Sequence, residues 1–212
     1  MSTLEDLKQA VVNAKRKDAA ALTQQALDEG HEPLEIMDDA LVPAMDEVGA
    51  LFAENKIYVP QMLVAARAMT AALDILKPLM ASDGSEPVGN AVIGTVAGDM
   101  HDIGKNLVRI MIESKNIQID DLGVDVTPDK FVEYLKEHPE CQIVCLSALL
   151  TTTMPAISST IQAITDAGLR DQVKIMVGGA PVTAEFAKEV GADAFTANAT
   201  EAGNKAYELL TA

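Results

Sequence analysis

The sequence predicts a helical bundle followed by an α/β domain with a doubly wound, five-stranded parallel sheet of the flavodoxin-like, Rossmann type. In the first part of the chain, apolar residues recur every three or four positions, as on one face of a helix. Beyond residue 87, short unbroken apolar runs alternate with helical periods, which is typical of parallel strands covered on both faces. Turn-forming residues fill the stretch 81–87. We therefore expect a helical cap domain at 1–83 and an α/β domain at 88–212.

The helical domain is predicted to contain four helices. Ser2 and Glu5 match a capping box at the start of the first helix. The other three helices are expected to begin near Asp18, Pro33 and Pro60, with Gly30 ending the second. Pro43 lies inside the third helix, where a proline removes a backbone hydrogen bond, so we expect a bend there. Together these helices predict a four-helix bundle.

The α/β domain is predicted from alternating strand and helix patterns. Its strands are expected, in chain order, at 91–96, 117–122, 143–146, 173–177 and 192–195. Its helices are expected at 104–114, 128–136, 155–167, 183–190 and 201–210. The strands at 117–122 and 192–195 show the weakest apolar pattern. Because each strand is followed by a helix, the connections are crossovers and the sheet is parallel.

Composition limits the partners that the chain can have. Hydrophobic residues form 49% of the 212 residues, which is enough for a buried core. Aromatic residues form only 3% and the net charge is −16, so neither a stacking surface for bases nor a basic patch for phosphates is expected. The opening MSTLEDLKQA lacks an export signal, and no apolar run approaches the roughly 20 residues of a membrane span. We expect a cytoplasmic protein that binds neither nucleic acid nor membranes.

The two cysteines are predicted to be core residues. Cys141 and Cys145 lie four positions apart beside the third predicted strand, and the chain has no further cysteine to form a second pair. This spacing matches neither a disulfide framework nor a zinc site. We expect two buried free thiols.

The loop after the first strand carries the most unusual motif. In a parallel sheet, ligands bind beyond the carboxyl ends of the strands. There, Asp99 and His101 lie two residues apart in a glycine-flanked turn that leads into a helix. An imidazole is a good ligand for a transition metal, and a carboxylate on its other nitrogen fixes the tautomer. The alternative is that Asp99 caps the next helix and His101 is an ordinary exposed loop residue.

The loops after the third and fourth strands carry hydroxyls and glycines. Ser147 and Thr151–Thr153 precede a helix, and we expect one threonine to cap it. Gly178 and Gly179 either serve a tight turn or let a bulky ligand lie against the backbone. No loop has the pattern of a nucleoside triphosphate site, and the glycines around His101 form a poor dinucleotide fingerprint.

Taken in chain order, these motifs resemble a known family. Asp99-x-His101-x-x-Gly104, Ser147-x-Leu149 and Gly178-Gly179 look like the cobalamin-binding domain of corrinoid methyl carriers and of methionine synthase. The helical part resembles the cap module of that family through Val48-Gly49-Ala50-Leu51-Phe52 and Tyr58-Val59-Pro60-Gln61. In size, the chain is similar to the free-standing corrinoid proteins of methylamine, methanol and O-demethylating methyltransferase systems.

The resemblance implies a role for each motif residue. His101 would be the lower axial ligand of a base-off cobalamin or related corrinoid, held by Asp99, which would share a proton with Thr153; methionine synthase usually has serine at the position of Thr153. Phe52 and Val59 would cover the methyl group, although Val59 equally fits plain bundle core. The residues implied to contact the cofactor, besides these, are Met100, Asp102, Ile103, Gly104, Ser147, Leu149, Thr151, Gly178, Gly179, Asn198, Ala199 and Thr200.

The resemblance also implies the function. The chain would carry a methyl group on cobalt, in one-carbon metabolism, from a substrate-specific methyltransferase to a second one that acts on a thiol or folate, with a reductive activator as a third partner. It would not be catalytic alone. The alternatives are a cobalamin-dependent sensor, for which the chain has no output domain, a radical mutase subunit, which generally lacks the cap, and a metal-free flavodoxin-like binding module. The sequence leaves open the methyl donor, the acceptor, the corrinoid and the oligomeric state.

Overall fold

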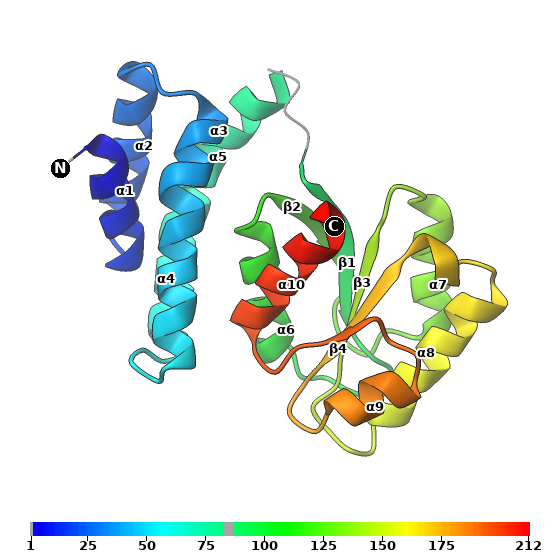
Figure 1. The fold of residues 1–212 in the computed structure, drawn as a ribbon. Helices are drawn as coiled ribbons and strands as arrows, with labels where there is room; N and C mark the ends of the chain where they lie inside the picture. The colour runs from blue at the N-terminus through cyan, green and yellow to red at the C-terminus, as the bar shows by residue number, and fades with distance from the viewer. Residues whose placement is uncertain (1, 83–86) are drawn as a thin grey trace. The chain divides into compact units, whose positions relative to one another are not determined.

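The chain divides into two compact units, Met1–Glu86 and Pro87–Ala212 (Figure 1). The computed structural model describes residues 2–82 and 87–212. Of the linker expected at 81–87, residues 81 and 82 belong to the end of a helix and residues 83–86 lie outside the described residues. Each unit has its own core and is described separately.

The described part of the first unit is built from four helical rods. Its elements are α1 (Thr3–Val12), α2 (Arg16–Asp28), α3 (Pro33–Ile36), the π-helical turn η1 (Met37–Leu41), α4 (Val42–Ala53) and α5 (Val59–Ser82). The Ser2 hydroxyl accepts a hydrogen bond from the Glu5 amide at 3.3 Å, so Ser2 caps α1 as predicted. Gly30, with φ +92°, follows α2 in the left-handed conformation that favours glycine. Together, α3, η1 and α4 form the predicted third rod.

The proline inside this third rod is accommodated by a π-helical turn. Pro43 has no N–H to donate, and in a regular α-helix its ring clashes with the carbonyl four residues earlier. Directly before Pro43, the Val42 amide donates to the carbonyl of Met37, five residues back instead of four. The wider turn relieves the clash without ending the helix. The structure therefore has a π-helical turn where the sequence predicted a bend.

Helix α5 is more apolar than the sequence pattern led us to expect. Within the described chain, Val59–Met80 is the single helical stretch, of 22 residues, that is long and apolar enough to cross a membrane. The expectation that no apolar run approaches this length was wrong. The side chains of Met62, Met69 and Leu76 are buried, and α5 packs against α2 and α4. Much of its apolar surface thus forms the core of the bundle.

The second unit contains the predicted five-stranded parallel sheet. Its strands are β1 (Gly89–Thr95), β2 (Ile117–Asp121), β3 (Ile143–Ser147), β4 (Lys174–Gly178) and β5 (Ala194–Phe195). They lie in the order β2-β1-β3-β4-β5, and every pair is parallel. This is the flavodoxin-like order, in which the chain winds outward in both directions from the centre. The sheet and its doubly wound topology confirm the predicted fold class.

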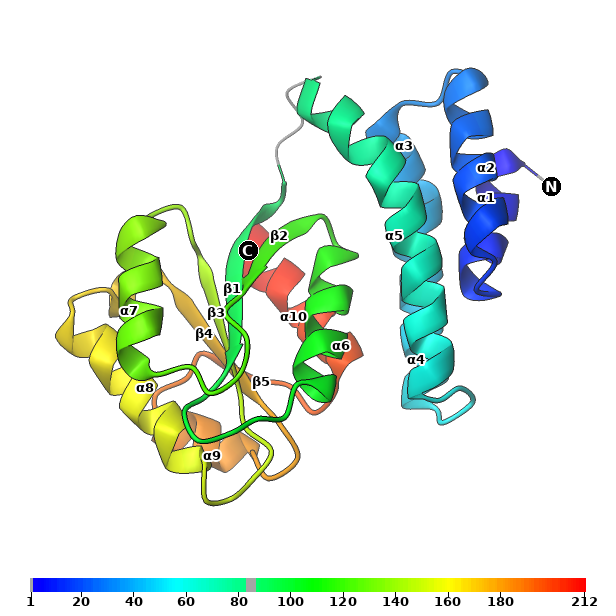
Figure 2. The same cartoon turned by 180° about the vertical axis from the view of Figure 1, so that it is seen from behind.

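Helices cover both faces of the sheet (Figures 1 and 2). They are α6 (Ile103–Glu113), α7 (Pro128–Glu137), α8 (Met154–Asp166), α9 (Ala184–Glu189), α10 (Ala199–Thr211) and the short 3-10 turn η2 (Arg170–Gln172). One apolar cluster joins the sheet to α6 and α10, and a second joins it to α7, α8 and α9. On β1, Ile93 belongs to the first cluster and Val92 to the second, which is the alternation of a strand buried on both sides.

Both cysteines are free and buried, as predicted. Burial raises the pKa of Cys141 and of Cys145 to about 12. Since the thiolate is the reactive form, both thiols should resist modification in the folded protein. We expect an aromatic disulfide reagent at pH 8 to label neither thiol in buffer and both in denaturing urea. Rapid labelling of the native protein would contradict this burial.

Candidate functional site

The sequence motifs meet where the sheet reverses its winding direction. From β1 the chain crosses to β2 on one side, and β3 then pairs with β1 on the other side. The loops that follow β1 and β3 therefore begin next to each other and lead to helices on opposite faces. Asp99 lies on the first loop and Thr153 on the second, and their side chains are in contact. The site is thus located at the carboxyl edge of the sheet, as predicted.

Asp99 is the centre of the polar contacts at this point. Its side chain is completely buried. Oδ1 accepts hydrogen bonds from the ring Nδ1 of His101 at 2.6 Å and from the His101 amide at 3.1 Å. Oδ2 accepts from the Leu149 amide at 2.7 Å, the Thr153 hydroxyl at 2.7 Å and the Leu150 amide at 3.4 Å. The carboxylate therefore ties the two loops together.

These contacts decide the charge of Asp99. Burial by itself raises the pKa of a carboxyl group, since it disfavours the charged form. The hydrogen bonds from Leu149, Thr153 and His101 outweigh this effect and hold the pKa of Asp99 well below its usual range. Asp99 is therefore an anion at neutral pH, although no solvent reaches it.

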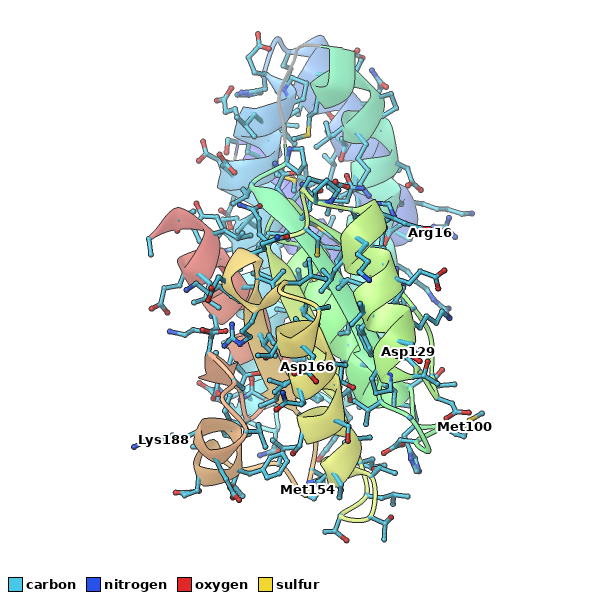
Figure 3. The ribbon with its side chains drawn as sticks, turned by 90° about the vertical axis from the view of Figure 1, so that its right-hand side faces the viewer. Arg16, Met100, Asp129, Met154, Asp166 and Lys188 are labelled. Carbon is cyan, nitrogen blue, oxygen red and sulfur yellow. The ribbon has the colours of Figure 1, made fainter. Side chains whose placement is uncertain are left out.

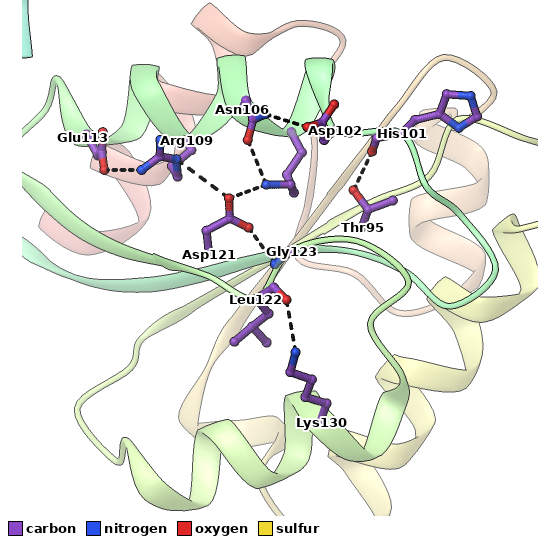
Figure 4. Close-up of polar contacts among 11 residues, drawn as sticks. Thr95, His101, Asp102, Asn106, Arg109, Glu113, Asp121, Leu122, Gly123 and Lys130 are labelled. Carbon is purple, nitrogen blue, oxygen red and sulfur yellow. Dashed lines mark hydrogen bonds and ion pairs between the residues drawn. The ribbon is translucent and has the colours of Figure 1, made fainter.

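The anionic Asp99 determines the tautomer of His101. A carboxylate can only accept hydrogen bonds, so Nδ1 of His101 carries a proton, and in the neutral ring the lone pair is therefore on Nε2. The His101 side chain is 50% exposed, and no described residue makes a hydrogen bond to Nε2. Figure 4 shows its ring pointing away from Asp102 and Thr95. Asp99 therefore orients the His101 ring and does not cap the following helix, as the alternative required.

A third loop, which was not predicted from the sequence, braces the segment that carries His101. Asp125, which follows β2, accepts from the Gly98 amide at 2.7 Å, and its own amide donates to the Asp99 carbonyl at 2.9 Å. Gly98 (φ +81°) and Asp125 (φ +53°) both have left-handed backbones. The sequence could have indicated Asp125, because it follows the predicted second strand and so lies at the same edge of the sheet as Asp99.

The Thr153 side chain does not cap α8, although a threonine cap was expected there. It occupies the N-cap position of α8, yet its hydroxyl donates to Asp99 and to the Leu150 carbonyl at 2.9 Å, and makes no capping hydrogen bond among the described residues. Its hydroxyl proton points to the buried, charged Asp99 carboxylate, and its oxygen accepts no hydrogen bond from the described amides of the helix. The expected threonine cap is therefore wrong for Thr153. The contact with Asp99 agrees with the role that the resemblance implied.

Exposed apolar side chains surround His101. Met100 is 68% exposed and Ile103 is 66% exposed, on the same loop and the next helix. Leu149 and Leu150, on the loop after β3, are also exposed. Figure 3 shows Met100 at the same end of the unit as Met154, the first residue of α8. Large apolar side chains left in water next to a potential metal ligand are typical of a surface that a bulky ligand covers.

The glycines of the motif fall into two kinds. Gly179 has φ +129°, and a Cβ there would lie 1.8 Å from the Ala148 carbonyl oxygen, so the protein itself requires glycine. At Gly178 a Cβ would lie 3.3 Å from the Thr196 carbonyl oxygen, a close but smaller approach. At Gly104, in the first turn of α6, a Cβ would meet nothing within 4 Å. Of these three, Gly104 therefore has no packing reason to be glycine.

The remaining predicted contacts lie on other parts of the same edge. Ser147 ends β3 beside Gly178 of β4, and Thr151 is exposed in the next loop. Asn198 caps α10 by accepting from the Glu201 amide at 2.9 Å, which is a structural reason for its presence. Ala199 is buried in the first turn. The hydroxyl oxygen of Thr200 is buried without a hydrogen-bond partner within the described chain.

Phe52 and Val59 belong to the helical unit. Phe52 lies in the last turn of α4, and Val59 is the first residue of α5. Both side chains are half-buried within that unit. Their predicted position over the cofactor stays a prediction.

The site defines a class of protein. Among the described residues, no group of three or more histidines, cysteines or carboxylates could hold a bare metal ion. His101 offers one nitrogen, and four exposed apolar side chains surround it. A single oriented imidazole on an apolar edge suits a metal that brings its own ring of ligands, as in a tetrapyrrole cofactor. The fold and the site thus define an α/β binding domain for a large metallocofactor.

Comparison with known proteins agrees with this class. Models of the B12 binding domain match residues 3–77 and 89–205. Dimethylamine corrinoid protein 1 of Methanosarcina acetivorans is 42% identical over 98% of this chain and 97% of its own length. A cobalamin-binding protein from Desulfitobacterium hafniense superposes with a TM-score of 0.82 at 29% identity, covering 97% of this chain and 98% of its own. The methanol:cobalamin methyltransferase complex of Methanosarcina barkeri matches with a TM-score of 0.83 at 25% identity, over 98% of this chain and 79% of the other.

The chain therefore belongs to the family of B12-binding corrinoid proteins. The family likeness extends over both units, so it includes the helical cap as well as the α/β domain.

Proposed function

We propose that this chain carries a methyl group on the cobalt of a corrinoid whose lower axial ligand is Nε2 of His101. The observation that carries the proposal is the 2.6 Å contact between Asp99 and Nδ1 of His101. It leaves Nε2 unprotonated and directed away from the protein at an apolar edge. A corrinoid held base-off, with its own base displaced by His101, fits this arrangement.

The residues of the site would adjust how strongly His101 binds. When bound, the corrinoid supplies a cobalt that accepts a methyl group from one partner and gives it to another. Asp99 accepts a hydrogen bond from His101 Nδ1 on one oxygen and from the Thr153 hydroxyl on the other. While Asp99 is charged, it increases the electron donation of Nε2, and a proton on Asp99 would weaken it. The Asp99 carboxylate and the Thr153 hydroxyl thus form a route through which proton uptake changes the axial bond.

The relatives support methyltransferases as partners. The names of several similar proteins refer to dimethylamine, and one solved relative is a complex with a methanol methyltransferase. We propose that a substrate-specific methyltransferase delivers the methyl group, that a second methyltransferase removes it to a thiol or folate, and that a reductive activator restores the cofactor. Phe52 and Val59 would cover the methyl group between these encounters. The protein would act in the cytoplasm.

Spectroscopy with added cobalamin tests the proposal. We expect the purified protein to bind cobalamin and to change its ultraviolet-visible spectrum to that of a form with the dimethylbenzimidazole displaced. The methylated form should then lose its methyl group when a methylamine-system acceptor methyltransferase and a thiol are added. A cobalamin spectrum that keeps the cofactor's own base bound, at saturating protein, would contradict the assignment of His101.

Gly104 offers a prediction that separates ligand binding from folding. A methyl group added at Gly104 meets no protein atom, so Gly104→Ala should change the free energy of unfolding by less than about 1 kcal/mol. If the corrinoid lies against this backbone, its affinity should fall by about tenfold. Urea denaturation and cobalamin titration measure the two effects.

Gly179→Ala is the matched comparison for this experiment. There, the clash with Ala148 and the positive φ should destabilise the fold itself by about 2 kcal/mol. Unchanged cobalamin affinity in Gly104→Ala would show that the cofactor does not approach this turn.

A further inference from the structure

A buried lysine lies in the first turn of α6, directly after the segment that carries His101. Lys105 is 3% exposed, and its ammonium group donates to Asn106 Oδ1 at 2.9 Å and to the carboxylate of Asp121, the last residue of β2. A lysine is costly there in two ways. The first turn of a helix is the positive end of its dipole, and a buried charge loses its hydration. Helix stability therefore does not explain why a lysine occupies this position.

One chain of hydrogen bonds connects Lys105, through Asn106, to Asp102, the residue next to His101 (Figure 4). Asn106, which accepts from Lys105, donates through its side-chain amide to Asp102 Oδ2 at 3.2 Å. Asp102 is the N-cap residue of α6, but its carboxylate makes no capping bond to the helix amides described. The hydrogen bonds of Lys105 to Asn106 and Asp121 thus fix the first turn of α6, which has no side-chain cap among the described residues.

A second chain of hydrogen bonds connects Asp121 to His101 itself. Asp121 Oδ1 accepts from the Gly123 amide at 2.9 Å, and the Gly123 carbonyl accepts from the Thr95 amide at 3.0 Å. The buried Thr95 hydroxyl then donates to the His101 carbonyl at 2.8 Å. In Figure 4, Asp121 lies between Asn106 and Gly123. Asp121 therefore belongs to both chains of hydrogen bonds: one leads through Lys105 to Asp102, and the other leads through Gly123 to His101.

We propose that the ion pair of Lys105 and Asp121 positions His101 for axial binding to cobalt. The inference rests on the proposed function, because it assumes that His101 is the ligand. The proposal assigns neither residue a contact with the cofactor, so both are positioning residues. The pair fixes the start of α6 against the end of β2, and thereby fixes the backbone on both sides of His101. A ligand held on a rigid backbone keeps its nitrogen in one direction, whereas a loose loop allows the bond to cobalt to open.

The test measures axial binding directly. Each variant is loaded with cob(II)alamin, and electron paramagnetic resonance reports the nitrogen splitting from the axial ligand, assigned by isotopic labelling of histidine. In Lys105→Met we expect the ratio of His-bound to unbound cobalt to fall by about tenfold, while cobalamin stays bound. Asp121→Asn, which keeps an acceptor for Gly123, should act in the same direction. If Lys105→Met does not fold, Asp121→Asn tests the same ion pair by the same measurement.

Arg109→Met is the matched control. Arg109 lies one turn later on the same helix, and its Nε is 3.9 Å from Asp121 Oδ2. It pairs with Glu113 and makes no bond to the first turn. Its loss removes the same charge and the longer ion pair with Asp121, but no hydrogen bond to Asp121 or to the first turn, so we expect the nitrogen splitting to remain as in the native protein.

The outcomes separate this inference from the proposed function. Native splitting in Lys105→Met, or an equal loss in Arg109→Met, would overturn the positioning role and leave His101 as the ligand. Native splitting in His101→Ala would overturn the ligand assignment, and the positioning role with it. If Lys105→Arg keeps the native splitting while Lys105→Met loses it, the ion pair is the cause of the effect.

Discussion

His101→Ala should bind cobalamin weakly and transfer methyl groups at least about 100-fold more slowly than the native protein. The variant removes the one nitrogen that the site directs outward, while the exposed apolar side chains around it remain to hold the corrin. We therefore expect binding to weaken without being lost. The absorption spectrum should lack the contribution of an axial histidine. Spectroscopic titration and single-turnover transfer to an acceptor methyltransferase measure the two effects.

His138→Ala provides the control for this prediction. His138 also contacts a carboxylate through Nδ1, with Glu140 Oε1 at 3.1 Å, and its side chain is 38% exposed. It lies at the end of α7, away from the loops that carry the motif. Its removal should leave the spectrum and the turnover unchanged. Equal spectra and turnover for His101→Ala and the native protein would refute the ligand role.

Asp99→Ala should be the most destabilising single change at the site. The variant leaves the buried Leu149 amide without its acceptor and removes the hydrogen bonds from Thr153 and His101. Hydrogen bonds to a buried charge are stronger than neutral ones, and unpaired buried donors are costly. We expect a loss of about 3 kcal/mol in the free energy of unfolding, measured by urea denaturation.

Asp193→Ala is the comparison for this loss. Asp193 also accepts from a backbone amide, that of Ile175 at 2.7 Å, and pairs with Arg170, but its side chain is 23% exposed. Water can replace its contacts, so its removal should cost about 1 kcal/mol. A smaller loss for Asp99→Ala than for Asp193→Ala would contradict the central role of Asp99.

The charge of Asp99 also predicts a pH dependence for the cofactor-free protein. Because the folded pKa of Asp99 lies below the unfolded value of 3.8, its stabilising contribution is complete only above about pH 5, where the carboxyl is charged in both states. It is lost as the pH falls from about 5 towards the folded pKa. The native protein should therefore lose stability more steeply than Asp99→Ala on acidification. Parallel curves for the two proteins would show that Asp99 is not held as an anion in the fold.

The sequence predicted the parts of this protein that depend on local pattern. The spacing of apolar residues marked the helices and strands to within a few residues, since burial on one face imposes its period on the chain. The pairing of Asp99 with His101 was also local, because a tight turn brings residues two apart into contact. The order of the motifs along the chain was then enough to indicate the family.

Contacts between distant segments could not be predicted in this way. Thr153 looked like a helix cap, because a hydroxyl before a helix usually bonds to the helix amides. In the fold, that hydroxyl instead donates to the buried carboxylate of Asp99, 54 residues earlier, a contact that the family resemblance implied but that no local pattern contains. No sequence pattern singled out Lys105 or Asp121. Only the pairing of β1 with β2 brings the start of α6 close to the end of β2.

The sequence by itself thus determined the architecture of the two domains, the edge of the sheet where the motifs meet and the histidine that stands out among them. The tertiary structure decided the chemical state of that histidine. Strand order placed the loops after β1 and β3 together, and their amide and hydroxyl groups keep Asp99 charged. A charged Asp99 puts a proton of His101 on Nδ1, so the neutral ring has its lone pair on Nε2. This state depends on hydrogen bonds between residues far apart in the chain, which no local pattern contains.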